Sequence, residues 1–149
     1  MVIYEAPAEY VFWYKLLYII PIGLFVGVVI TAFNLEYEAS LVLVCEGIFF
    51  VLLFYSIMPR RYQIFHDRLR IVLGTPFGIN IPLSTIKEVR HSSGMKAFVY
   101  SGIRFAASTK NVIEIVRNKG FNYVISPKNG EVFKEYLDVA MKEETHSRY

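Results

Sequence analysis

The most constraining feature of this sequence is an apolar segment, residues 39–58, that ends at Pro59-Arg60-Arg61. It carries a single acid, Glu46, and no lysine or arginine. A helix of that length rises about 30 Å, which matches the hydrocarbon core of a bilayer. Proline stops a helix, and arginine favours the headgroup layer beyond it. The segment therefore predicts a membrane-spanning helix that ends where a basic region begins.

An earlier apolar segment, 16–33, is uncharged and follows a cluster of aromatic residues at Tyr10, Trp13, Tyr14 and Tyr18. Such clusters mark the membrane interface. A cleavable signal peptide is the competing interpretation, but the N-terminus is acidic and a second span follows within a few residues. The short acidic connector 34–38 makes the two helices antiparallel. We therefore predict a two-helix transmembrane hairpin over 1–58, with spans at about 12–33 and 39–58.

Charge is divided unevenly along the chain. Residues 59–149 hold 15 of the 16 Lys and Arg residues and 8 of the 13 acids, a net charge of +7. By the positive-inside rule the side of the membrane beyond residue 58 is cytoplasmic, so both termini of this two-span cell-membrane protein are expected in the cytoplasm. The basic domain could attract anionic lipid headgroups. Alternatively, the charges only keep a small β domain soluble.

Three features of the predicted spans invite interpretation. Glu46 is an acid deep in the second span, which suggests helix pairing, a proton or ion site in a small transporter or channel subunit, or a protonated group bonded to a neighbour. Gly23 and Gly27 have the GxxxG spacing, which lets a second helix approach closely. Cys45 is the single cysteine, so no disulfide is possible, and packing is its simplest role.

After residue 61 the pattern changes to short alternating strands separated by turn residues. Asp67-Arg68 marks a tight turn, and residues 74–78 and 118–120 contain the glycines that turns prefer. Seven strands are expected, at 62–66, 69–73, 79–83, 86–92, 103–108, 112–117 and 121–125. We predict a mainly β, partly open barrel of about seven antiparallel strands.

One helix is expected after the last strand. Ser126 is a candidate N-cap, and Pro127 suits the first helical position. Apolar residues then recur on one face at Val132, Phe133, Tyr136, Leu137, Ala140 and Met141. The cytoplasmic domain is thus expected over 59–143, with a frayed tail at 144–149.

The order of these features resembles the prokaryotic pleckstrin-homology (PH)-like membrane proteins. The resemblance rests on two membrane helices followed by Tyr62-x-Ile64-x-x-Asp67-x-Leu69-x-Ile71, Ile81-Pro82-Leu83-x-x-Ile86-x-x-Val89, Tyr123-x-Ile125-Ser126-Pro127 and Phe133-x-x-x-Leu137. It covers Tyr62 to about Met141 and fits a bacterial or an archaeal origin. It implies the fold and a binding or scaffolding role, with no catalytic residues to transfer. The first hairpin loop lacks a Lys/Arg cradle, so inositol phosphate binding is not carried over.

The sequence offers no motif of a serine hydrolase, a P-loop or a dinucleotide site, so no enzyme activity is expected. The three histidines lie far apart, and neither a metal site nor a cofactor is predicted. We expect a domain that engages the lipid bilayer, anionic headgroups, a membrane protein partner or a second copy, and no nucleic acid. The residues expected to contact lipid or partner are Arg60, Arg61, Arg68, Arg90, Met95, Lys96, Phe98, Tyr100 and Arg104, four of them in the long loop 93–102.

Overall fold

The computed structural model describes residues 2–33, 36–74, 76–92 and 102–146. Within these residues, eight strands and three α-helices follow one another, with a short 3₁₀ helix, Leu83–Thr85, after the fourth strand. In order they are β1 (Val2–Pro7), α1 (Phe12–Ala32), α2 (Tyr37–Ile57), β2 (Arg61–Phe65), β3 (Arg68–Val72), β4 (Gly78–Pro82), β5 (Ile86–Ser92), β6 (Ile103–Phe105), β7 (Val112–Arg117), β8 (Tyr123–Ile125) and α3 (Gly130–His146).

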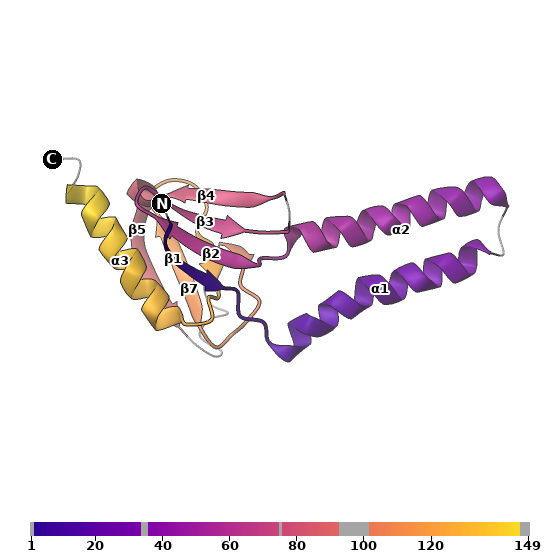
Figure 1. Ribbon diagram of the computed structural model, residues 1–149, viewed down its shortest axis with the longest axis horizontal. Coiled ribbons are helices and arrows are strands. Elements are labelled where there is room, and N and C mark those ends of the chain that lie inside the picture. Colours follow the sequence, from indigo (N-terminus) through magenta and orange to yellow (C-terminus); the bar gives the residue numbers. More distant parts are fainter. Residues whose placement is uncertain (1, 34–35, 75, 93–101, 147–149) are drawn as a thin grey trace.

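Helices α1 and α2 lie alongside one another and extend away from the β domain, as Figure 1 shows. Their bounds lie within two residues of the predicted helices at 12–33 and 39–58. In the part of the chain that the structure describes, α2 is long and apolar enough to cross a membrane, and the shorter apolar stretch of α1 is Ile19–Ala32. No residue of α2 is buried, so the chain itself leaves this helix open to its surroundings.

The N-terminal strand belongs to the β domain and not to the hairpin. Sequence analysis assigned the hairpin to 1–58, but β1 pairs antiparallel with β2, with Pro7 opposite Arg61. Ala6 is buried in the core, and the Tyr4 ring stacks on Tyr136 of α3 at 4.4 Å. The two helices are therefore inserted between two neighbouring strands of one sheet (Figure 1).

The strands form two sheets of four, in the orders β1-β2-β3-β4 and β5-β7-β8-β6. All seven predicted strands exist, and β1 makes eight in the described residues. The prediction that every strand pairs antiparallel is wrong, because β6 runs parallel to β8, with Arg104 opposite Val124. The chain reverses direction from β6 to β7 and again from β7 to β8, so β6 and β8 run the same way, and β6 pairs with β8 rather than with β7.

The core lies between the two sheets and under α3. Phe133, Leu137 and Ala140 of α3 are buried there, as the predicted apolar face requires, whereas Val132 and Tyr136 of the predicted face are exposed. The predicted helix start is wrong: α3 begins at Gly130, and the Phe133 amide donates to the Asn129 carbonyl. Ser126 is fully buried and uses its hydroxyl elsewhere, so it does not cap α3.

The GxxxG expectation is also wrong. Positions for a Cβ on Gly23 and Gly27 have no neighbouring atom within 4 Å, so this pair faces away from α2. The close contact is made by Gly47 of α2, where an added Cβ would lie 3.0 Å from the Phe25 ring of α1. The periodicity of α1 explains this, because Phe25 lies halfway between the two glycines and thus on the opposite face.

Candidate functional site

The short segment between β1 and α1 is hydrogen-bonded to both sheets. The Ala8 amide donates to the Arg60 carbonyl at 2.9 Å, on the side of the first sheet. The Glu9 amide donates to the Ser126 carbonyl at 2.8 Å, and the Val11 amide to the Ala107 carbonyl at 3.1 Å, on the side of the second. These three backbone hydrogen bonds fix the direction in which the chain enters α1. The hairpin is therefore attached firmly to the domain.

Tyr62 and Ser126 join the two sheets below this segment. The Tyr62 hydroxyl donates to the Phe105 carbonyl at 2.7 Å and accepts from the Ser126 amide at 3.3 Å. Both side chains are fully buried, and burial raises the pKa of Tyr62 well above its usual range, so the phenol stays neutral. The Ser126 hydroxyl accepts from the Ala107 amide at 2.9 Å and donates to the Glu9 carbonyl.

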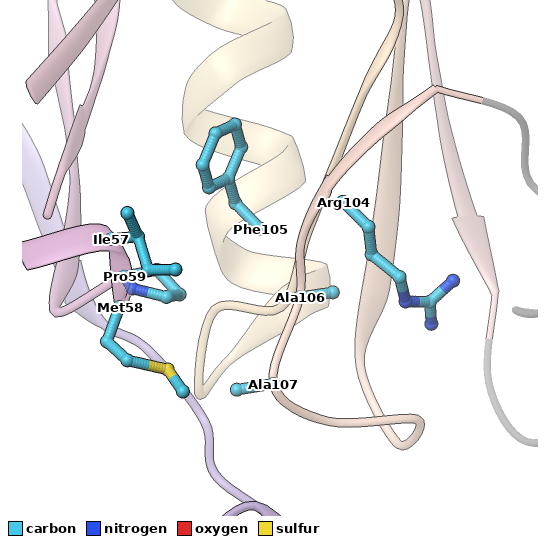
Figure 2. Close-up of a pocket in the computed structure, with 7 residues that line it drawn as sticks. All are labelled: Ile57, Met58, Pro59, Arg104, Phe105, Ala106 and Ala107. Atoms are coloured by element: carbon cyan, nitrogen blue, oxygen red, sulfur yellow. The ribbon is translucent and has the colours of Figure 1, made fainter. Parts of the chain in front are cut away.

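A cavity of about 270 Å³ lies where α2 meets β6. Figure 2 shows its two walls: Ile57, Met58 and Pro59 come from the end of α2, and Phe105, Ala106 and Ala107 from β6 and the residues after it. Arg104 also lines the cavity, but in this view its guanidinium group points away from the α2 wall. The enclosed surface is therefore mostly apolar and suits an apolar group better than a phosphate.

The start of β2 is anchored by its neighbours. The Arg60 guanidinium lies over the Tyr55 ring at 4.3 Å, which fixes the charge at the end of α2. Arg61 forms an ion pair with Glu5 at 3.0 Å, across the β1–β2 ladder. The Gln63 side chain and Arg61 hold the pKa of Glu5 below its ordinary value of 4.5, with burial opposing them. Arg60 thus packs against the end of α2, and Arg61 joins the two strands that flank the hairpin.

The other predicted contact residues do not gather at one place. Arg68 follows the β2–β3 turn, where His66 approaches Glu143 near the end of α3, and it pairs with Asp67 at 3.5 Å. Arg90 lies on β5, with Glu88 at 2.8 Å and the buried Glu114 at 3.6 Å. The predicted loop contacts Met95, Lys96, Phe98 and Tyr100 lie outside the described residues.

Several residues at the junction were missed by the sequence analysis. Tyr62 joins the first sheet to Phe105 and Ser126 of the second, and Ser126 also bonds Glu9 and Ala107. The sequence pattern predicted Tyr62 only as a strand residue and Ser126 as a helix cap. Their contacts join positions up to 117 residues apart, so no local spacing reveals them. The apolar residues in 2–7 were the available signal for β1.

The Glu46 side chain is exposed on α2 and forms no hydrogen bond or ion pair with any residue in the described ranges. Its neighbour Gly47, by contrast, faces the Phe25 and Val28 side chains of α1. Within the described residues no group of three His, Cys, Asp or Glu side chains is placed to hold a metal ion.

Comparison with known proteins gave one match. The sequence-family model described as "Bacterial PH domain" matches residues 60–140, more than half of the chain. No curated protein matches the chain. No solved structure matches it either.

Proposed function

This chain belongs to the bacterial PH domain family, and from that premise we propose that it is a membrane-anchored binding module. In this proposal α1 and α2 hold the PH-like domain against the cytoplasmic face of the cell membrane. The domain then engages another membrane protein. It carries no catalytic role, in keeping with PH-like domains as a class of binding modules.

The observation that carries the proposal is the insertion of the two helices between β1 and β2. Their ends leave and re-enter the domain at adjacent positions, Pro7 and Arg61, which face each other across one ladder. A flexible tether would let the domain drift from the membrane, whereas hydrogen-bonded strands at both helix ends keep it there. The same end of the domain therefore faces the bilayer at all times.

We propose that both helices cross the membrane. Each has 21 residues, long enough for a bilayer core of about 30 Å. The acidic residues Glu36 and Glu38 lie at the tip of the hairpin, and Arg60 and Arg61 at its base. The positive-inside rule then places the base and both termini in the cytoplasm.

The distribution of charge favours a protein partner over an anionic lipid surface. Arg61, Arg68 and Arg90 each pair with a carboxylate at 2.8–3.5 Å, which reduces their attraction for phosphate. Arg68 also lies at the end of the sheet away from the hairpin. Lipid binding by electrostatics needs several cations at one surface. A net charge of +7 spread over a small domain instead suits complementary contact with an acidic protein surface.

Topology and partner binding can be tested on the full chain. A reporter that is active in the cytoplasm, fused after residue 149, should be active, and the protein should stay in the membrane after carbonate extraction. A reporter active only outside the cell would refute the topology. Reconstituted full chain should also show no preference for added anionic over neutral vesicles at 150 mM salt, because a salt-sensitive preference would favour the lipid ligand.

A transport role for Glu46 receives no support from a specific contact. Transport needs polar groups along a path, and the described contact between α1 and α2 is made by apolar groups such as Phe25, Val28 and Gly47. We therefore do not favour this alternative.

A further inference from the structure

Glu46 lies near the middle of α2. The helix runs from Tyr37 to Ile57, so Glu46 is about 13 Å from one end and about 16 Å from the other, at 1.5 Å per residue. If α2 crosses the membrane as proposed, this carboxyl group lies close to the bilayer centre. A carboxyl group there is costly to bury unless another group satisfies it.

Within the described part of the chain, no side chain forms a hydrogen bond or ion pair with the Glu46 carboxyl. Gly47 marks the side of α2 that packs on α1, and one residue along a helix is a rotation of about 100°, so Glu46 lies on a flank of the hairpin. Exposed residues continue this flank at spacings of three and four, forming a stripe along the helix. We call it the Glu46 face; its members are Ala39, Val42, Glu46, Phe50, Leu53 and Ile57. A stripe of this spacing is the surface that a neighbouring helix contacts.

A second copy of this chain is a poor match for the Glu46 face. Parallel copies in one membrane bring equal depths together, so Glu46 would meet another Glu46. The basic residue of the spans, Lys15, lies three residues from the start of α1, about 12 Å nearer the cytoplasmic end than Glu46. In a parallel second copy the backbone of this lysine therefore lies at a different depth from Glu46.

We infer that the Glu46 face docks a membrane-spanning helix of a different protein that carries a lysine or arginine at mid-depth. The inference rests on the proposed membrane anchoring and names the class of partner. The ion pair would satisfy both groups in a medium where an unpaired charge is expensive, while Phe50 and Leu53 pack against the partner helix. The face lies on the helix that leads directly into β2, so docking would fix the domain beside its partner.

The test uses the full chain in neutral-lipid vesicles with designed single-span peptides. The peptides share one Leu/Ala host sequence and carry Lys, Leu or Glu at the centre, and energy transfer between labels reports association. The Lys peptide should bind at least tenfold more tightly than the Leu peptide, a difference of about 1.4 kcal/mol. The Glu46→Leu variant should lose this preference, whereas Glu38→Gln, a change at the end of the same helix, should keep it.

Three results would overturn the inference. Equal binding of the Lys and Leu peptides would remove the role of charge, as would a preference that survives in Glu46→Leu. Association of the full chain with itself that depends on Glu46 would assign the face to a second copy. Carbonate extraction of the same vesicles distinguishes failure of the membrane anchoring from failure of the docking. A chain that is extracted refutes both proposals. A chain that stays in the membrane but shows no preference for the Lys peptide refutes the docking alone.

Discussion

The Tyr62 hydroxyl is the group whose removal best tests how the two sheets are joined. It donates to the Phe105 carbonyl at 2.7 Å and accepts from the Ser126 amide at 3.3 Å, and it is fully buried. Replacing Tyr62 by Phe keeps the ring and its edge contact with Phe133 at 6.2 Å between centroids. The change therefore isolates two hydrogen bonds.

The expected loss follows from those two bonds. A buried hydrogen bond contributes about 1 kcal/mol net, and a buried partner left unsatisfied costs about 1–3 kcal/mol. The longer bond to Ser126 contributes at the low end, so Tyr62→Phe should lower the free energy of unfolding by about 2–4 kcal/mol. Urea-dependent proteolysis of the full chain in detergent micelles measures this free energy.

The matched control for this experiment is Tyr136→Phe. That hydroxyl is on a half-exposed residue and forms no hydrogen bond within the described part of the chain, so its loss should change stability by less than about 0.5 kcal/mol. Equal stability of Tyr62→Phe and the native chain would refute the assignment of this hydroxyl as the link between the sheets.

Three further changes test other parts of the fold. Glu5→Gln should destabilise the domain slightly at pH 7, by no more than about 1 kcal/mol. The pKa of Glu5 is lowered, so its carboxylate contributes stability above pH 4.5 that is lost as the pH falls. Melting curves across the pH range should therefore show the difference between variant and native chain fading in acid. Asp138→Asn should instead stabilise the domain at neutral pH. Burial raises the pKa of Asp138 although Lys134 and Lys142 lower it, so ionisation of this carboxyl opposes folding. The gain in stability should vanish towards pH 3.8, and no gain in melting temperature at pH 7 would contradict this. Gly74→Ala should lower the free energy of unfolding by about 1–3 kcal/mol, because its Cβ would collide with the Tyr55 carbonyl and lie 2.7 Å from Ser56 Cα. Gly23→Ala is the control: its Cβ would lie in open space, so the same proteolysis assay should show no loss of stability.

The sequence predicted the elements whose signals are local. Strands such as Val112–Arg117 alternate or run apolar between turn residues, and the face of α3 follows from the spacing of Phe133, Leu137 and Ala140. The two long helices follow from apolar length, within two residues at their ends. These features depend on a few neighbouring residues and need no knowledge of the rest of the chain.

The features that the sequence did not predict depend on distant partners. β1 is recognisable through its pairing with β2, more than fifty residues later, and the interruption by two apolar helices led the sequence analysis to group residues 2–7 with the hairpin. Ser126 has the residue type of a helix cap, yet its hydroxyl is hydrogen-bonded to the Ala107 amide and the Glu9 carbonyl instead. Gly23 and Gly27 have the spacing of a packing motif, but spacing does not show which face of α1 meets α2.

The central claim is that the two helices are a membrane anchor inserted between β1 and β2 of a PH-like domain. The most direct test replaces residues 9–59 by a two-residue Asn-Gly turn, so that Ala8 leads into Arg60 as in a tight hairpin. We expect this variant to leave the membrane fraction and to unfold cooperatively as a β-rich monomer, while the full chain stays in the membrane. Membrane association of the shortened variant, or a full chain recovered in the soluble fraction, would contradict the account.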